Sequence, residues 1–340
     1  MGKSCFLITG GSGFIGTNFC QLLSQKYKVI NLDKLSYCSV PEKYKKINKK
    51  NYKFIKSDIS NTRIIKKIFH KHKIDFLVNF ASESHVDRSI DNPKKFIGDN
   101  INSTLSLLDT LKNLKDKNKL KNNFKFIHIS TDEVYGSSFL PLNEKSKLKP
   151  NSPYSSSKAS IDNILRSYGK TYNFPYIICR PCNNFGPYQF LEKFVPTIIT
   201  KVSKNKKIPL YGDGKNLREW IYVEDTCKAI FKICLKSKIY ETYNIGSSVR
   251  LKNIDLCKII YNAKFKNLNN FNSRIDKVYD RPGHDRSYSI NSNKINKGIY
   301  KTKVNKRYII KKFEETVKWY YVNSKWVNSC FLNFKGKRLG

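Results

Sequence analysis

Long hydrophobic runs are missing from this chain of 340 residues. No stretch approaches the roughly 20 uninterrupted apolar residues that a membrane-spanning helix needs. The apolar segment near the start is too short for a signal peptide and leads directly into a glycine-rich loop. Phe6 also stands where an N-myristoylation motif requires Ser or Thr. We therefore expect a soluble, cytoplasmic protein that has no membrane partner.

A cysteine framework is also lacking. The nine cysteines are scattered, and Cys179 and Cys182 form the one close pair in the sequence. A zinc ribbon would need a second such pair. A redox role for the pair is weakly supported, because it falls inside a longer motif described below. We expect free structural thiols and no metal site.

Acidic residues are few. The 26 Asp and Glu stand against 65 Lys and Arg, which gives a formal net charge of +39 and raises the alternative of a nucleic-acid partner. The lysines are spread along the whole chain, with runs at 43–56, 112–125, 201–207 and 301–312, and no nucleic-acid-binding motif accompanies them. We expect a solvated basic surface and no nucleic-acid partner. The same charge would attract an anionic small-molecule substrate.

Short apolar runs alternate with helical patterns in the first half of the chain, which is typical of a parallel sheet. We expect strands at 4–9, 28–32, 52–56, 76–80, 124–130 and 176–180, and helices at 14–25, 61–71, 93–114 and 154–171. Beyond residue 185 the pattern is irregular, with strands expected at 207–211 and 242–245 and helices at 224–236 and 253–263.

These patterns predict an α/β fold: a Rossmann-type doubly wound parallel sheet with a smaller C-terminal substrate-binding lobe. The predicted domains are 1–185, which holds most of this sheet and to which the chain later returns, and 186–330, the smaller lobe. A tail is expected at 331–340.

A glycine-rich loop follows the first predicted strand, where Gly10, Gly13 and Gly16 form a G-x-x-G-x-x-G pattern. Glycines allow a tight turn and let backbone amides approach a pyrophosphate at the start of the next helix. Asp33 ends the second predicted strand about 20 residues later, where a carboxylate binds ribose hydroxyls and repels a 2′-phosphate. The pattern predicts a dinucleotide site and favours NAD over NADP. The alternative for Asp33 is the cap of a helix or of a turn.

Tyr154 and Lys158 stand four residues apart at the start of a predicted helix, which places both side chains on one face. A lysine ammonium near a tyrosine lowers the pKa of the phenol, so that the phenolate becomes an accessible base. The same lysine can hold the ribose of a nicotinamide. This spacing arises by chance in lysine-rich chains, and its position after a Rossmann half makes it informative here.

Thr131, Asp132 and Glu133 directly follow the fifth predicted strand. Catalytic groups of open parallel sheets gather at such carboxyl ends. Two adjacent carboxylates in a closed site repel each other, so one of them tends to keep its proton. The pair then offers one acid and one base, which the elimination of water requires. The alternative is a solvated loop that happens to carry Asp-Glu.

Six segments together resemble the extended short-chain dehydrogenase/reductase superfamily and, within it, the dTDP-glucose 4,6-dehydratases. They read TGGSGFIG at 9–16, ASESHVDRS at 81–89, STDEVYG at 130–136, NNFGPYQ at 183–189, GDGKNLREWIYVED at 212–225 and RPGHDR at 281–286. The resemblance covers about residues 4–325. It implies an NAD-dependent hydro-lyase of deoxysugar biosynthesis, such as the rhamnose pathway. Residues 1–185 would then be the NAD-binding domain, and residues 186–330 would be the nucleotide-sugar-binding lobe. The implied substrate is dTDP-glucose, with UDP-glucose as a second candidate, and the implied assembly is a homodimer formed through the helices at 93–114 and 154–171.

The resemblance also implies a role for each catalytic residue. Tyr154 takes the proton of the sugar 4-hydroxyl while hydride passes from C4 to NAD, and Thr131 hydrogen-bonds that hydroxyl. Glu133 then removes the C5 proton, Asp132 protonates the departing C6 hydroxyl, and hydride returns to C6. Lys158 completes the predicted catalytic set.

Further positions are carried over by motif. Besides Tyr154 and Lys158, the cofactor would contact Gly10, Gly13, Phe14, Ile15, Gly16, Asp33, Lys34, Leu35, Ser36, Asp58, Ile59, Phe80, Ala81, Ser82, Glu83, Asp99 and Asn184. The nucleotide sugar would contact Ser84, Thr131, Asn183, Lys193, Phe194, Pro209, Leu210, Tyr211, Arg218, Asn244, Arg281 and His284. Arg218 and Arg281 suit the diphosphate, because guanidinium groups bind such oxygens in pairs. The alternative for Asp58 is a helix cap.

Five positions depart from the family pattern. Ser82 replaces an Ala, Phe185 a Tyr, Thr226 a His and Ser287 an Arg. Asp99, near the cofactor, stands where Thr is usual, and an added carboxylate there would weaken or reshape a contact. The closest alternative functions are a nucleotide-sugar 4-epimerase and a UDP-glucuronate decarboxylase of the same superfamily. Neither needs an acid that expels a C6 hydroxyl, so Asp132 separates the dehydratase from both. A non-catalytic, basic nucleic-acid-binding protein is a remote alternative, which would be expected to have a damaged active site.

Overall fold

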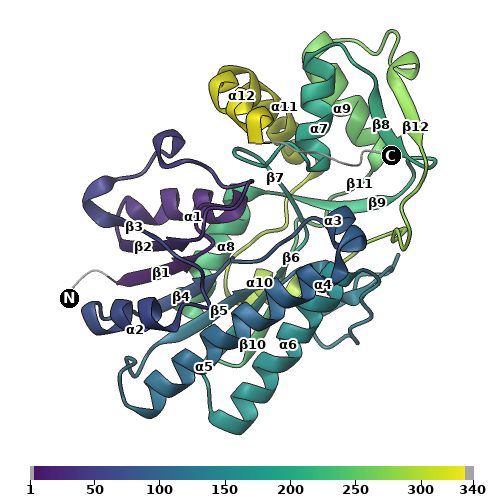
Figure 1. Cartoon of the computed structure of the whole chain (residues 1–340). Helices are drawn as coiled ribbons and strands as arrows, with labels where there is room; N and C mark the ends of the chain where they lie inside the picture. The colour runs from purple at the N-terminus through teal and green to yellow at the C-terminus, as the bar shows by residue number, and fades with distance from the viewer. Residues whose placement is uncertain (1–3, 334–340) are drawn as a thin grey trace.

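The centre of the protein is a seven-stranded parallel sheet in a computed structural model that describes residues 4–333. The strand order is β10–β6–β5–β4–β1–β2–β3, and every neighbouring pair is parallel (Figure 1). The strands are β1 Cys5–Thr9, β2 Lys28–Asp33, β3 Tyr52–Lys56, β4 Phe76–Asn79, β5 Lys125–Ile129, β6 Tyr176–Pro181 and β10 Glu241–Ile245. The order reverses between β1 and β4, which is the point at which doubly wound sheets bind ligands. The predicted fold class is confirmed.

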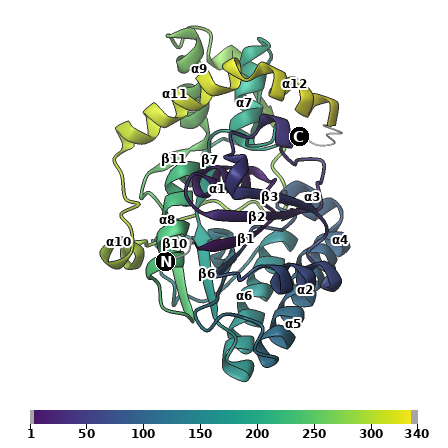
Figure 2. The same cartoon turned by 90° about the vertical axis from the view of Figure 1, so that its left-hand side faces the viewer.

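Helices cover both faces of this sheet (Figures 1 and 2). One face carries α1 (Phe14–Ser24) and α8 (Val223–Lys236), and the other carries α2 (Thr62–Lys71), α5 (Ser103–Asp116) and α6 (Pro153–Tyr172). Alternate side chains of β1 serve the two cores: Phe6 and Ile8 pack on the α1 side, whereas Leu7 packs on the α5 side. Such strands read as continuous apolar runs because both of their faces are buried.

The segment before α5 differs from its prediction. The sequence predicts one helix at 93–114, whereas the structure has α4 (Pro93–Ile97), a π-helical turn (Gly98–Asn102) and then α5. Inside the turn, the buried Asn100 side chain bonds both the amide and the carbonyl of Glu83 and also donates to Ser157 Oγ at 2.9 Å. These three bonds hold Asn100 in place within the wider turn. Such π turns inside helices are frequent at functional sites.

A smaller lobe lies beyond the carboxyl edge of the main sheet, at the top of Figure 1. Its strands form a three-stranded sheet of β11 (Arg250–Lys252), β9 (Leu217–Tyr222) and β7 (Asn183–Phe185), and a parallel pair of β8 (Ile208–Tyr211) and β12 (Ile275–Val278). Its helices are α7 (Phe194–Ser203), α9 (Asn253–Phe265), α11 (Lys306–Val322) and α12 (Ser324–Asn333). They share one aromatic core, in which the rings of Phe185 and Phe313 stack with centroids 3.7 Å apart.

Two elements from the second half of the chain lie with the main sheet. β10 pairs with β6 at the edge, and α8 packs beside α1. The division of the chain at residue 185 stays a prediction, and β10 shows where the chain returns across it. Of the predicted tail at 331–340, residues 331–333 end α12, and residues 334–340 lie outside the described part of the chain. Among residues 4–333, no helix combines the length and the apolar character that crossing a membrane requires.

Candidate active site

Three adjoining cavities follow the carboxyl edge of the main sheet. The outer cavity contains Asp33, the central cavity contains Lys158, and the lobe cavity contains Arg281. The outer and central cavities share Gly10, while the central and lobe cavities share Glu133. The three cavities therefore adjoin one another at the switch point of the sheet, where doubly wound folds bind their ligands.

The glycine loop forms a wall that the outer and central cavities share. Gly10 has a φ of 72°, and a Cβ added there would lie 2.5 Å from the amide nitrogen of Ala81. A Cβ on Gly16 would lie 2.3 Å from the carbonyl oxygen of Gly10. Both positions therefore require glycine. Since α1 begins directly behind the loop and no side chain caps its first amides, the loop fits a pyrophosphate.

Asp33 lines the outer cavity at the end of β2. Its Oδ2 accepts a hydrogen bond from the amide of Ser12, and its Oδ1 accepts one from the amide of Leu35, both at 2.8 Å. Asp33 therefore does cap the turn at Leu35, as the alternative interpretation expected. Each oxygen keeps a further lone pair, so the fixed carboxylate also fits the hydroxyls of a ribose. Burial raises the pKa of Asp33, and the two amides oppose that shift.

Thr131 caps the short 3₁₀ turn that follows β5, Asp132–Tyr135. Its Oγ1 accepts a hydrogen bond from the amide of Glu133 at 3.3 Å and donates one to Oδ1 of Asp132 at 3.2 Å. The turn ends at Gly136, which has a φ of 75°. Asp132 and Glu133 consequently both line the central cavity.

These two carboxyl groups differ in their surroundings. Oδ2 of Asp132 and Oε2 of Glu133 are buried, and neither has a hydrogen-bond partner within the described residues. Burial raises the pKa of Asp132 well above its usual value, and the charges of Glu133 and Glu219 add to the shift. Burial also raises the pKa of Glu133, but the guanidinium groups of Arg281 and Arg218 oppose it. Asp132 therefore keeps its proton more readily, and Glu133 is the better base.

Tyr154 and Lys158 lie on one face of α6 and both line the central cavity. The ammonium of Lys158 donates to the carbonyl of Ile129 at 2.5 Å, and burial lowers the pKa of Lys158 to about 8. Burial also raises the pKa of the Tyr154 phenol; the charge of Glu133 adds to this and a hydrogen bond with Thr131 opposes it. Burial thus dominates the pKa of the phenol in this structure, and the lowering of that pKa by Lys158 stays a prediction.

A buried network supports this cluster from behind. Arg180 donates from Nε to Oδ2 of Asp162 at 2.9 Å and from Nη1 to the hydroxyl of Tyr135 at 2.7 Å. Ser130, at the end of β5, donates to the same Oδ2 at 3.1 Å. Asp162 lies one turn after Lys158 in α6, and its charge opposes the lowering of the lysine pKa. The network therefore ties the 3₁₀ turn, β6 and α6 together.

Basic side chains line the lobe cavity. Nη1 of Arg281 pairs with Oδ1 of Asp87 at 3.0 Å, and Nη2 of Arg218 donates to the carbonyl of Asp285 at 2.7 Å. Lys193 lines both this cavity and the central one. Because each guanidinium has five N–H donors and uses part of them here, both keep donors for a diphosphate.

Most of the predicted site residues line one of the three cavities. The outer cavity contains Gly10, Gly13, Asp33, Lys34, Ser36, Asp58, Ile59, Phe80, Ala81, Ser82, Glu83 and Asp99. The central cavity adds Phe14, Ile15, Gly16, Ser84, Thr131, Asp132, Glu133, Tyr154, Lys158, Asn183, Asn184 and Lys193. The lobe cavity adds Phe194, Pro209, Tyr211, Arg218, Arg281 and His284. The structure thus brings these side chains together, and their individual roles stay predictions.

Three predicted contact residues lie outside the linings of these cavities. Leu35, with a φ of 62°, forms the turn that Asp33 caps. Leu210 is buried in the core of the smaller lobe. Asn244 is fully buried, and its amide bonds the hydroxyl of Tyr135 and the carbonyl of Leu142. In this geometry Leu210 packs the core and Asn244 holds Tyr135, the last residue of the 3₁₀ turn, so their contacts with a ligand stay predictions.

Glu192 is an acidic residue of the site that was not predicted from the sequence. Glu192 lines both the central and the lobe cavity, accepts a hydrogen bond from the Tyr37 hydroxyl at 2.6 Å and pairs with Nε of Arg88 at 3.3 Å. The guanidinium of Arg88 also lies 3.8 Å from the centre of the Tyr37 ring. The available signal was local, since Glu192 precedes Lys193 and Arg88 lies inside the motif at 81–89.

No group of three or more His, Cys, Asp or Glu side chains among the described residues could hold a metal ion. Cys179 and Cys182 are free and buried, and burial raises the pKa of both thiols well above the ordinary value. Such thiols are unreactive, so this pair packs the region around β6.

Comparison of sequences identifies the relatives of the chain. Residues 7–313 match the protein family described as GDP-mannose 4,6 dehydratase. The chain is 40% identical to the dTDP-glucose 4,6-dehydratase of Salmonella typhimurium, with 95% of this chain and 94% of that protein covered. It is 39% identical to dTDP-glucose 4,6-dehydratase 1 of Escherichia coli K12, with the same shares covered.

Solved structures give the same grouping. DesIV, a dTDP-glucose 4,6-dehydratase from Streptomyces venezuelae with NAD and TYD bound, has a TM-score of 0.85 and 35% identity, covering 96% of this chain and 99% of that one. The UDP-glucose 4-epimerase of Thermotoga maritima has a TM-score of 0.82 but only 25% identity, covering 94% and 99%. Epimerases thus share the fold, while the sequence is closer to the dehydratases. The chain belongs to the dTDP-glucose 4,6-dehydratase family of the extended short-chain dehydrogenase/reductases.

Proposed function

We propose that this protein is an NAD-dependent 4,6-dehydratase that converts dTDP-glucose into its 4-keto-6-deoxy derivative. The observation that carries the proposal is the pair of buried carboxyl groups, Asp132 and Glu133, beside Tyr154 in one cavity. A 4-epimerase and a decarboxylase have no use for a protonated acid at this place. The names of the relatives support the same reaction.

The outer and central cavities fit NAD. The glycine loop provides amides for the pyrophosphate, Asp33 fits a ribose, and Lys158 lies where the nicotinamide end would reach the central cavity. When bound, this cofactor supplies the acceptor for the hydride that leaves sugar C4 and the donor of the hydride that arrives at C6.

The protein's own residues move the protons. Tyr154, as the phenolate that the ammonium of Lys158 would favour, takes the proton of the sugar 4-hydroxyl. The resulting C4 ketone acidifies the C5 position, from which Glu133 removes a proton. Asp132 gives its proton to the C6 hydroxyl, which leaves as water, and Glu133 later returns its proton to C5. Thr131 contacts both Tyr154 and Asp132, so it can pass the proton gained from the 4-hydroxyl to the acid that lost one. Each residue then ends the cycle as it began.

The nucleotide end of the substrate belongs to the lobe cavity in this proposal. Arg218 and Arg281 bind the diphosphate, and Lys193 lies between the diphosphate and the sugar. The NAD site then belongs to residues 1–185, and most of the nucleotide-sugar site belongs to residues 186–330.

Incubation with NAD and with dTDP-, UDP- or GDP-linked glucose, followed by mass spectrometry, tests the proposal. We expect the loss of one water from dTDP-glucose, and turnover of UDP-glucose would identify the second candidate base. Glu133→Gln should abolish the loss of water, whereas Glu315→Gln, at an exposed ion pair of α11, should leave it unchanged. An oxidised or epimerised product that retains its water would overturn the dehydratase assignment.

We further propose that the protein is a cytoplasmic homodimer. The predicted interface helices, α4–α5 and α6, lie side by side on one outer face (Figure 1). Light scattering after size-exclusion chromatography should give twice the mass of one chain, and a monomer at micromolar concentration would contradict this.

Salt-sensitive retention on immobilised nucleic acid, together with no turnover of any nucleotide sugar, would instead support the nucleic-acid alternative.

A further inference from the structure

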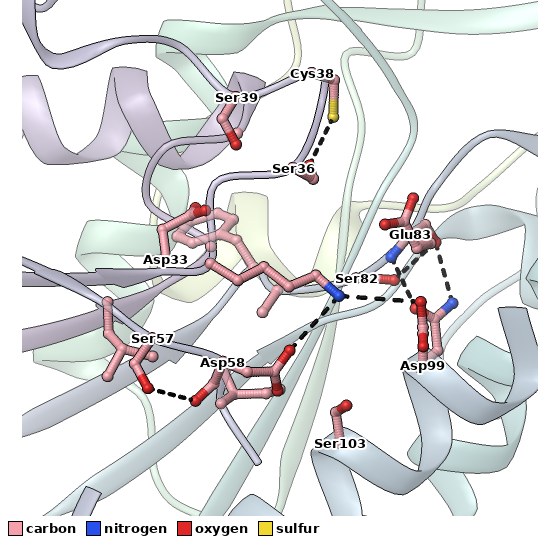
Figure 3. A pocket seen from close by; sticks show the side chains of 18 residues that line it. Asp33, Ser36, Cys38, Ser39, Ser57, Asp58, Ser82, Glu83, Asp99 and Ser103 are labelled. Carbon is pink, nitrogen blue, oxygen red and sulfur yellow. Dashed lines mark hydrogen bonds and ion pairs between the residues drawn. The ribbon is translucent and has the colours of Figure 1, made fainter. Parts of the chain in front are cut away.

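The outer cavity holds a lysine between two carboxylates. The ammonium of Lys34 lies 3.6 Å from Oδ2 of Asp58 and 3.9 Å from Oδ2 of Asp99. Figure 3 shows this arrangement, with dashed lines from one nitrogen to the labelled Asp58 and Asp99. The three side chains come from the residue after β2, the loop after β3 and the π turn before α5. A single ammonium therefore joins three separate segments across the cavity.

The position of Lys34 creates a conflict in cofactor choice. A carboxylate at the end of the second strand, such as Asp33, repels a 2′-phosphate, whereas a cation near the same ribose accommodates one. Lys34 directly follows Asp33, so the sequence offers both signals side by side. The position of the Lys34 ammonium therefore determines whether the cavity favours NAD or NADP.

The lining of the outer cavity decides against the phosphate. Its charged side chains are the carboxylates of Asp33, Asp58, Glu83 and Asp99 and the ammonium of Lys34. Two of the carboxylates hold the ammonium, and hydrogen bonds from the backbone and side chain of Ser60 fix Asp58 in place. The remaining field is negative, which disfavours a second anion beside the ribose.

We propose that Asp99 is a specificity-determining residue for the cofactor, which together with Asp58 holds Lys34 and so excludes NADP. The proposal rests on the proposed function, because it takes NAD as the cofactor. Side-chain exposures of 45% for Lys34 and 36% for Asp99 make their ion pair a weak one. Asp99 therefore shifts the preference by a moderate factor, and Asp33 still disfavours the 2′-phosphate.

Calorimetric titration with NAD and with NADP at low salt tests this role. Asp99→Asn should raise the ratio of NADP affinity to NAD affinity by roughly three- to tenfold, because it frees the ammonium from one of its two carboxylates and removes one negative charge. In the Lys34→Met background the same substitution should give a clearly smaller gain, since the ammonium that would bind the phosphate is absent.

Asp116→Asn is the matched control. It makes the same charge change on a half-exposed residue at the end of α5 that does not line the cavity, and it should leave both dissociation constants unchanged. An unchanged ratio of NADP affinity to NAD affinity in Asp99→Asn, an equal gain in Asp116→Asn, or an undiminished gain without Lys34 would overturn the role of Asp99 while leaving the dehydratase assignment intact. Failure of the wild-type protein to bind NAD would overturn both.

Discussion

Replacing Asp132 with Asn tests the acid step of the proposed reaction. The amide is neutral and has the size of a protonated carboxyl, and it can keep the hydrogen bond that Oδ1 accepts from Thr131. It has no proton to release to a leaving hydroxyl. Because burial and the charges of Glu133 and Glu219 already favour the protonated form of Asp132, the substitution changes little charge. We expect the free energy of unfolding to change by less than about 1 kcal/mol.

The expected loss of rate follows from the role of the acid. A positioned general acid contributes about 10²–10⁴ in rate, which is about 3–5 kcal/mol of activation free energy. Turnover of Asp132→Asn should fall by that factor. Oxidation at C4 depends on Tyr154 and Lys158, so reduced cofactor should still form at close to the wild-type rate and should accumulate when elimination is slow.

Rapid mixing with dTDP-glucose measures both steps, because absorbance follows the reduced nicotinamide and mass spectrometry follows the loss of water. Asp116→Asn, the same substitution at an exposed residue of α5, should behave as the wild type in both measurements. Full turnover by Asp132→Asn would refute the acid role. A variant that is folded but no longer reduces NAD would show that Asp132 acts earlier than elimination.

Three further predictions concern the fold around the site. Gly16→Ala should weaken NAD binding at least about tenfold in calorimetric titration, because its Cβ would lie 2.3 Å from the carbonyl oxygen of Gly10. In the control Gly298→Ala, the added Cβ meets no atom within 4 Å, and NAD should bind as it does to the wild type. Burial lowers the pKa of Lys158 to about 8, so above that pH the unfolded chain binds more protons than the folded one. The free energy of unfolding should therefore rise by about 3 kcal/mol between roughly pH 8 and 10. Denaturant titrations should show this rise, and Lys158→Met should remove it. Asp162→Asn should destabilise the fold by about 3–5 kcal/mol in the same assay, because it leaves the Arg180 charge buried without its partner, and a loss below about 1 kcal/mol would contradict this.

The main sheet could be predicted from the sequence because its strands are short apolar runs bounded by turn residues. The predicted strand at 52–56 coincides with β3, and the prediction at 176–180 differs from β6 by one residue. β9 was missed, because its Arg218 and Glu219 break the apolar pattern although both are buried. Their burial depends on partners from distant segments, such as the amide of Ser248 for Glu219, which no local pattern contains.

The site residues were predictable where they lie inside motifs, but a motif does not give the direction of a side chain. Pro209 and Tyr211 line the lobe cavity, so Leu210 between them points to the opposite side of β8, into the core. The contact of Tyr37 with Glu192 joins residues 155 positions apart, and only the packing of the smaller lobe on the main sheet brings them together.

Sugar labelled with deuterium at C4 gives the most direct test of the central claim, that one site oxidises C4, eliminates water and reduces C6. After incubation of the protein with NAD and [4-²H]dTDP-glucose, mass spectrometry and NMR should show the loss of one water and the deuterium on C6 of the product. A product that keeps its water, or one that has lost the deuterium to solvent, would contradict the account.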